Sequence, residues 1–278
     1  MGERDYMRAV SAQHTAADLG AKILAGLRAA GKDPDSLRLE DLAQGDQLHA
    51  GGVPATRALI RRAAIEPGMR VLDIGGGLGG PARLIAHDAG CSVTVLDLSE
   101  ENCEAGAMLT ACVGLSDRVT FRQGSALAMP FPDGAFDWAW MQHAAMNIAE
   151  KERLFREIHR VLRPGGRLAM HEIMAGPVQP LLFPVPWAPD ASINFLQPSA
   201  EIRVLLAAIG FGEVEWVEER EALLAGMQAS AAGGPLANPY PLAALVIYGE
   251  QYPEMARNVG RNLREDRITI VQAVVERP

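Results

Sequence analysis

The fold of this chain is decided by one stretch, Val71-Leu72-Asp73-Ile74-Gly75-Gly76-Gly77-Leu78-Gly79-Gly80. It begins inside an apolar β-run, Arg70–Ile74, and ends in glycines that precede a helical segment reaching Asp88. Glycine lets a backbone adopt positive φ and approach a ligand closely. The stretch therefore predicts a strand, a ligand-binding loop and a helix, although a tight turn without a ligand has the same composition.

The spacing of this glycine loop leaves two interpretations open. Gly75, Gly77 and Gly80 fit G-x-G-x-x-G, and Asp97 lies about 20 residues further on, as in nicotinamide dinucleotide sites. Asp73, however, precedes the first glycine, where a carboxylate would repel a pyrophosphate but attract an ammonium group. Asp97 ends a predicted strand and can accept hydrogen bonds from both hydroxyls of a ribose, or it can cap the next helix.

Short β-runs alternate with helical segments from residue 70 onward. This alternation predicts an α/β fold, a Rossmann-like, mostly parallel sheet of seven strands with helices on both faces. The predicted strands are Arg70–Ile74, Ser92–Leu96, Val119–Arg122, Phe136–Met141, Arg167–Ile173, Glu213–Val217 and Ile268–Val275. The predicted helices include Ala16–Ala30, Asp35–Leu42, Pro54–Ala64, Glu150–Leu162 and Pro198–Ile209. Ser99 is expected to cap the helix after the second strand, and the last strand to return beside the sixth.

Two helical regions lie outside this predicted sheet. We divide the chain into an N-terminal helical lid, residues 1–60, and an α/β core, residues 61–278, with a helical cap insertion at about 222–265. The proline-rich stretch 177–189 is predicted to loop over the sheet edge with its apolar side chains buried. We expect the lid and the cap to exclude water from the ligand site.

Composition and charge narrow the class of protein. The net charge of −8 over 278 residues disfavours nonspecific binding to nucleic acid or to an anionic membrane. The three cysteines lack C-x-x-C spacing, and no metal-ligand spacing is visible, so neither a disulfide framework nor a metal site is expected. There is no signal-peptide pattern and no apolar run of about 18 residues. We therefore expect a cytoplasmic protein, a monomer or a homodimer.

The glycine loop, Asp97 and three later segments together resemble the class I S-adenosylmethionine-dependent methyltransferases, over roughly residues 45–275. The later segments are Gly124–Asp133, Phe136–Trp140 and Val161–Leu168, in the order and spacing typical of that family. The segment Asp46–Gly52 is similar to the cofactor-covering segment of its small-molecule branch. That branch includes the sarcosine/dimethylglycine, phosphoethanolamine, tocopherol and sterol methyltransferases.

The resemblance implies S-adenosyl-L-methionine as the cofactor. The residues that it implies for binding are Asp73, Gly75, Gly77, Gly79, Asp97, Leu98, Ser125, Ala126 and Gln142. The glycine loop and Asp73 would hold the methionine part, Asp97 the ribose and Leu98 the adenine. Ser125 stands where the family often has an acidic residue, but its hydroxyl can still accept one hydrogen bond from the adenine amino group.

Methyl transfer from a sulfonium is an in-line displacement, so the protein must align the acceptor, exclude water and remove any acceptor proton. His143, after the fourth strand, is the first candidate for a general base, because imidazole titrates near neutral pH. Glu172, near the end of the fifth strand, is the second candidate. Either side chain could instead be structural. The expected acceptor pocket, whose members could also belong to the core, is formed by His49, Met146, Met174, Trp187 and Phe195.

The expected activity is methyl transfer to a small molecule, in the first place carbon methylation of a hydrophobic natural product or terpenoid. One alternative is N-methylation of a small amine such as a glycine derivative. Another is a methyltransferase-like cyclase that keeps the cofactor without transferring its methyl group. A nicotinamide-dependent oxidoreductase is disfavoured by Asp73 and by the Pro164-Gly165-Gly166 turn.

Overall fold

The computed structural model describes residues 3–43, 46–225 and 241–278. The described chain is built around a seven-stranded sheet in the order β3-β2-β1-β4-β5-β7-β6. The strands are β1 (Arg70–Ile74), β2 (Ser92–Asp97), β3 (Val119–Gln123), β4 (Phe136–Gln142), β5 (Leu162–Ala175), β6 (Gly212–Glu218) and β7 (Ile268–Glu276). β7 runs antiparallel between β5 and β6, and the other neighbours are parallel. The predicted Rossmann-like, mostly parallel fold is confirmed.

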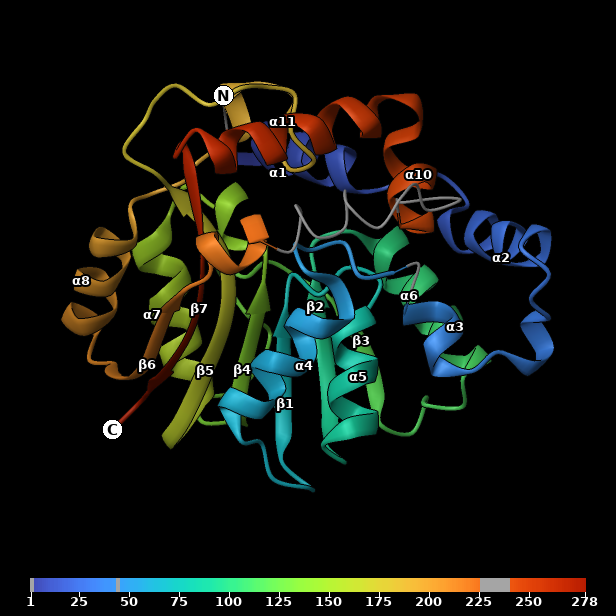
Figure 1. Ribbon diagram of the computed structural model, residues 1–278. Helices are drawn as coiled ribbons and strands as arrows, with labels where there is room; N and C mark the ends of the chain where they lie inside the picture. Colours follow the sequence, from blue (N-terminus) through green and yellow to red (C-terminus); the bar gives the residue numbers. More distant parts are fainter. Residues whose placement is uncertain (1–2, 44–45, 226–240) are drawn as a thin grey trace.

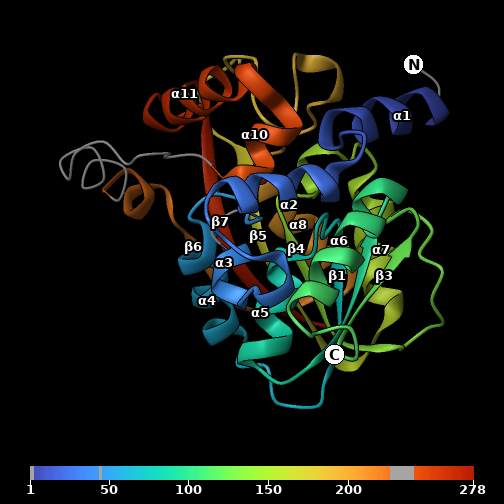
Figure 2. The ribbon, with the colours of Figure 1, turned by 90° about the vertical axis from the view of Figure 1, so that its right-hand side faces the viewer.

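Helices cover both faces of the sheet and its upper edge (Figure 1). They are α1 (Glu3–His14), α2 (Leu19–Ala29), α3 (Leu39–Ala43), α4 (Gly52–Ala63), α5 (Gly80–Asp88), α6 (Glu100–Cys112), α7 (Lys151–Val161), α8 (Ser199–Ile209), α10 (Leu242–Tyr248) and α11 (Tyr252–Arg264). α4 and α5 pack on one face, and α7 and α8 on the other. Both ribbon views place α1, α10 and α11 across the edge where the parallel strands end (Figures 1 and 2).

Alternation along each strand divides the core into two layers. In β1, Val71 packs with the α4 and α5 side, whereas Leu72 packs with the α7 and α8 side. Neighbouring residues of a strand point to opposite faces, and a sheet covered on both faces needs apolar residues at both. All of Val71–Ile74 is buried because both faces are covered. Asp73 is buried with its apolar neighbours, although its side chain is a carboxylate.

The strand order reverses direction between β1 and β4. From β1 the chain continues outward to β2 and β3, and it then returns to form β4 on the other side of β1. The registers of Val71 with Trp138 and of Asp73 with Val95 bring the ends of β1, β2 and β4 to one level. Open α/β sheets bind ligands beyond the carboxyl ends of their strands at this kind of crossing point.

Most predicted elements occur within a few residues of their expected bounds. β7 returns beside β6, as expected, and it also pairs with β5. Ser99 caps α6, since its Oγ accepts from the N–H of Asn102 at 3.1 Å. The loop after β5 buries Leu181, Val185 and Trp187, while Phe183 is half-buried. No helix of the described chain combines the length and the apolar character that crossing a membrane requires.

Three elements differ from their prediction. The helix expected over Asp35–Leu42 is a 3-10 turn, Pro34–Ser36, followed by α3, because Asp33 accepts from the N–H of Asp35 and starts a separate turn. The helix expected from Ala16 starts at Leu19. β5 begins at Leu162 rather than at Arg167, because Gly165 and Gly166 pair with the backbone of Arg277.

In the expected cap at 222–265, residues 226–240 lie outside the described residues, and α10 and α11 are separated by a 3-10 turn, Gly249–Gln251.

The segment before α4 is fixed to the core by a buried ion pair. Arg83 of α5 is fully buried, and its Nη2 lies 2.5 Å from Oδ2 of Asp46. Nη1 of Arg83 also donates to Oγ1 of Thr110 at 2.8 Å. Removing one member of such a pair leaves a charge that is buried and unpaired, which costs about 3–5 kcal/mol.

We therefore expect Arg83→Met to lower the free energy of unfolding by about 3–5 kcal/mol, as measured by urea denaturation. Arg57→Met is the matched control, because the Arg57–Asp88 pair is exposed, with side-chain accessibilities of 40% and 23% against 0% and 2% for Arg83 and Asp46. Exposed pairs contribute about 0–1 kcal/mol. Equal losses in the two variants would contradict the structural role assigned to Arg83.

Candidate functional site

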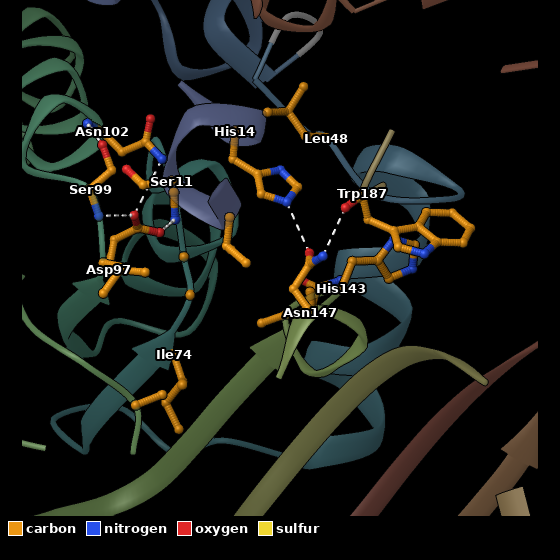
Figure 3. Close-up of a pocket in the computed structure, with 18 of the residues that line it drawn as sticks. Ser11, His14, Leu48, Ile74, Asp97, Ser99, Asn102, His143, Asn147 and Trp187 are labelled. Atoms are coloured by element: carbon orange, nitrogen blue, oxygen red, sulfur yellow. Dashed lines mark hydrogen bonds between the residues drawn. The ribbon is translucent and has the colours of Figure 1, made fainter. Parts of the chain in front are cut away.

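A cavity of about 210 Å³ opens beyond the carboxyl ends of β1, β2 and β4, and a second cavity of about 10 Å³ lies on the other side of β5. The larger cavity is lined by the glycine loop, by the residues that follow β2 and β4, by the Asp46–His49 segment and by α1 and α10. Figure 3 shows its two ends, with Asp97 at one end and His143 and Trp187 at the other. Of these two cavities in the described chain, the larger one is the candidate ligand site.

The glycine loop forms the floor of this cavity. Gly75 has a φ of +67°, and a Cβ added to it would lie 2.6 Å from the Cβ of Ala144. A Cβ on Gly80 would lie 2.8 Å from the carbonyl oxygen of Asp46. Because a side chain at either position would displace a neighbouring segment, these glycines permit close backbone packing as well as an unusual conformation.

Asp73 lies beneath the glycine loop with its carboxylate buried. Its Oδ2 has no hydrogen-bond partner within the described chain. Burial and the nearby Asp97 raise the pKa of Asp73 to about 7, while Arg83 acts in the opposite direction. A positively charged ligand group beside Asp73 would lower the pKa of its carboxyl, because it would favour the ionised form.

Asp97 accepts three hydrogen bonds at the end of β2. The N–H of Gly77 donates to Oδ2 at 2.9 Å, the N–H of Ser99 donates to Oδ1 at 2.9 Å, and Nδ2 of Asn102 donates to Oδ1 at 3.3 Å (Figure 3). Burial raises the pKa of Asp97, and these hydrogen bonds oppose that rise. The cap of α6 is supplied by Ser99, so Asp97 instead joins the glycine loop to the end of β2.

Three imidazoles gather at the end of β4 and β5. The ring centroid of His143 lies 4.9 Å from that of His171 and 6.0 Å from that of His49. Burial lowers the pKa of His49 to about 4 and of His171 to about 3, and it lowers the pKa of His143 well below 6.5. The three rings are therefore uncharged at neutral pH.

Gln142 connects this histidine cluster to the lining. Its Oε1 accepts from Nε1 of Trp140 at 2.8 Å and from Oγ1 of Thr56 at 3.3 Å, and its Nε2 lies 3.3 Å from Nδ1 of His171. His143 follows directly with a φ of +53°. The imidazole of His143 belongs to the cavity lining, and its Nε2 is buried there without a hydrogen-bond partner among the described residues.

α1 covers the cavity through a chain of hydrogen bonds. Nε2 of His14 lies 2.9 Å from Oδ1 of Asn147, and its Nδ1 lies 3.2 Å from the hydroxyl of Tyr248 in α10. Nδ2 of Asn147 donates to the carbonyls of Trp187 and Ile193 at 2.8 and 2.9 Å. Residues distant in sequence thus meet over the cavity, as Figure 3 shows for His14, Asn147 and Trp187.

Most of the site residues predicted from the sequence line the larger cavity. These are Asp73, Gly75, Gly77, Asp97, Leu98, Ser125, Ala126, Gln142, His49, His143, Met146 and Trp187. Four do not. Gly79 precedes α5, and the ring of Phe195 packs edge-on against Tyr6 with centroids 5.6 Å apart. Glu172 and Met174 line the smaller cavity.

Sequence reasoning missed the lining residues that come from the helices over the cavity. They are Tyr6, Val10, Ser11, His14, Ile247 and Tyr248, together with Asn102 and Asn147. One signal was available in α1, because Tyr6, Val10 and His14 follow at four-residue spacing and so share one helix face. Nothing in that spacing indicates which surface the face would cover.

Residues 72–170 match the family model of the methyltransferase domain. Over 114 residues the chain is 40% identical to a sterol 24-C-methyltransferase of Gibberella zeae, and the match covers 41% of this chain and 30% of the relative. It is 31% identical over 165 residues to a sarcosine/dimethylglycine N-methyltransferase of Halorhodospira halochloris, which covers 57% of each chain. The chain thus spans less than two thirds of the length of the curated relatives it matches.

The fold also resembles a solved structure over nearly the whole chain. The geranyl diphosphate C-methyltransferase of Streptomyces coelicolor A3(2) superposes with a TM-score of 0.69 at 16% identity, over 98% of both chains. The strand order, the cavity at its crossing point and the domain match agree with one another, and they favour a methyltransferase over an oxidoreductase. Residues 72–170 therefore match a methyltransferase domain, in agreement with the resemblance found in the sequence.

Proposed function

We propose that this chain transfers the methyl group of S-adenosyl-L-methionine to a small hydrophobic acceptor molecule. The observation that carries the proposal is the continuity of one cavity, which runs from Asp73 and Asp97 at the glycine loop to the uncharged His143 at the end of β4. A cofactor held at the first end would present its reactive group towards the second. Holding two reactants in this way can lower the activation free energy by about 7–11 kcal/mol.

The residues at the glycine loop fit the proposed cofactor. The unpartnered Oδ2 of Asp73 suits the ammonium group, and the carboxylate of Asp97 suits the ribose hydroxyls. Leu98 and Ala126 offer apolar surface for the adenine, and Ser125 offers a hydroxyl beside it. When bound, the cofactor supplies an activated methyl group on a sulfonium.

The lining of the acceptor end supports a hydrophobic acceptor, such as a terpenoid or another natural product, with carbon as the proposed methylated atom. Tyr6, Val10, Met146 and Trp187 provide apolar surface there. The described lining includes no lysine or arginine to pair with a carboxylate or a diphosphate. N-methylation of a glycine derivative is therefore less well supported than methylation of a molecule without an anionic group.

His143 is the proposed proton acceptor. A neutral imidazole can take a proton at Nε2 from the acceptor or from the methylated intermediate, and this buried atom has no hydrogen-bond partner among the described residues. Glu172 does not line the same cavity, so we do not assign it this role. α1 and α10 are the proposed lid, because His14 and Tyr248 meet above the cavity and exclude water from it.

Transfer of an isotopically labelled methyl group tests the proposal directly. We expect incubation with S-adenosyl-L-methionine that carries a trideuteromethyl group, in the presence of a panel of terpenoids and other apolar natural products, to give a product whose mass includes that group. Mass spectrometry identifies the product, and fragmentation locates the label on carbon, nitrogen or oxygen. A converted product of unchanged mass would indicate a cyclase and would overturn methyl transfer.

Asp97→Asn is expected to weaken binding of S-adenosyl-L-homocysteine at least about tenfold. A hydrogen bond to a charged group contributes about 1.5–3 kcal/mol, and each 1.4 kcal/mol is about tenfold in affinity. Calorimetric titration measures the change. Glu101→Gln is the control, because Glu101 is an exposed carboxylate close to Asp97 in sequence that does not line the cavity. Equal affinity of Asp97→Asn and the parent chain would remove Asp97 from the proposed site.

His143→Gln is expected to reduce kcat at least about 100-fold with the acceptor found in the labelled panel, because a general base contributes about 10²–10⁴-fold. Since burial lowers the pKa of His143 well below 6.5, the base form dominates at neutral pH. The rate of the parent chain should therefore stay constant around pH 7 and fall only at a pH well below 6.5. An unchanged kcat in the variant would show that His143 only shapes the cavity.

A further inference from the structure

The segment His143–Ile148, which follows β4, carries much of the acceptor end of the cavity. All of its residues except Ala145 line that cavity, and Ala145–Asn147 form a 3-10 turn. His143 has a φ of +53°, a conformation that costs an L-residue other than glycine roughly 1–2 kcal/mol. Strained residues of this kind persist only where surrounding contacts hold them in place.

A carboxylate holds this segment from the side opposite to the cavity. Glu172 of β5 is 1% exposed, and its two oxygens accept from the backbone N–H groups of Ala144 at 3.0 Å and Ala145 at 3.2 Å. Its neighbour His171 points to the other face of the sheet and joins the histidine cluster. Glu172 therefore binds the two peptide groups that come directly after His143.

An ammonium group holds the same segment by its carbonyls. Nζ of Lys151 donates to the carbonyl oxygens of Ala145 and Phe195 at 2.8 Å, and also to that of Ile148. Lys151 is the first residue of α7, where a positive charge is unfavourable to the helix dipole. Helix stability therefore does not account for a lysine at this position, whereas the three carbonyls do.

Burial works against both of these charges. It raises the pKa of Glu172 to about 7 and lowers the pKa of Lys151 to about 8, although the two groups attract each other and the Ala144 and Ala145 N–H groups favour the carboxylate. Two buried charges are costly unless they are paired and hydrogen-bonded. Here each charge satisfies backbone groups of the His143–Ile148 segment.

We propose that Glu172 and Lys151 are positioning residues, which hold the His143–Ile148 segment so that His143 keeps its strained backbone and its place in the wall of the acceptor end. This positioning role rests on the proposed function, which defines the acceptor end. The contact of Ala144 with Gly75, where no Cβ would fit, transmits the same constraint to the glycine loop. The two buried charges thus fix the acceptor end relative to the cofactor end.

Titration of the His143 ring tests this proposal without an acceptor. The chain is labelled with nitrogen-15 histidine, and the imidazole shifts of its six histidines are followed against pH, with His143 assigned by its loss in His143→Gln. In the parent chain we expect His143 to stay neutral well below pH 6.5. In Glu172→Ala the segment should relax, and the pKa of His143 should rise towards its ordinary 6.5.

That rise separates positioning from simple electrostatics. Burial raises the pKa of Glu172 to about 7, so this group is uncharged in the pH range where His143 titrates, and loss of its charge alone would leave the pKa of His143 unchanged. Leu168→Ala is the matched control, since Leu168 is a fully buried residue on the same face of β5 and its loss creates a core cavity without touching the segment. We expect the control to leave the pKa of His143 unchanged.

Glu172→Gln extends the test if Glu172→Ala does not fold. The amide oxygen of glutamine can accept one of the two N–H groups, so Glu172→Gln should raise the pKa of His143 by a smaller amount. An unchanged or lower pKa in these variants, or an equal rise in Leu168→Ala, would overturn the proposal. Binding of S-adenosyl-L-homocysteine by the parent chain, measured in parallel, reports on the proposed function separately.

Discussion

The site depends on one close contact, between the glycine loop after β1 and the segment after β4. A Cβ at Gly75 would lie 2.6 Å from that of Ala144, so the two segments fit together only because Gly75 has no side chain. β1 and β4 are adjacent parallel strands. After β1 the chain moves outward to β2 and β3, and it then returns to form β4 on the other side of β1. The ends of β1 and β4 therefore place a loop suited to a cofactor beside residues suited to an acceptor, and every other part of the site is arranged around this contact.

Buried charge is concentrated around the same contact. Asp73, Asp97, Glu172, Lys151 and the Asp46–Arg83 pair are all buried or nearly so. Hydrogen bonds compensate for some of these groups, and Asp73 keeps an unpartnered oxygen. Perturbed pKa values gather at functional sites because burial and specific partners are arranged there for a chemical task. Glu172 and Lys151 bind backbone groups beside the cavity, whereas Asp73, which lines it, keeps an oxygen without a partner among the described residues.

Local patterns in the sequence were sufficient for the sheet and for the cofactor end of the site. β1, the glycine loop and Asp97 are continuous in sequence, so periodicity and glycine spacing describe them well. The turn at Asp33 was missed because a side-chain hydrogen bond to the backbone interrupts an otherwise helical pattern. The face of α1 with Val10 and His14 was missed because its position over the cavity depends on contacts with α10 and Asn147.

For the two candidate bases, His143 and Glu172, the local sequence likewise does not determine which groups each side chain contacts. Alternation along β5 indicates that His171 and Glu172 point to opposite faces, but it does not say which face meets the cavity. Pairing of β5 with β4 and the packing of α7 decide that question, and they turn Glu172 towards the backbone of Ala144 and Ala145. His143 follows β4 and lines the cavity, although its strained backbone has no sequence signal.

The central claim is that the cavity at the glycine loop is built for S-adenosyl-L-methionine. The most direct measurement is calorimetric titration of the purified chain with S-adenosyl-L-homocysteine and, under the same conditions, with NADH. The structure predicts saturable binding of S-adenosyl-L-homocysteine at one site per chain and much weaker binding of NADH, whose pyrophosphate would face Asp73. Preferential binding of NADH, or no binding of S-adenosyl-L-homocysteine, would contradict the account.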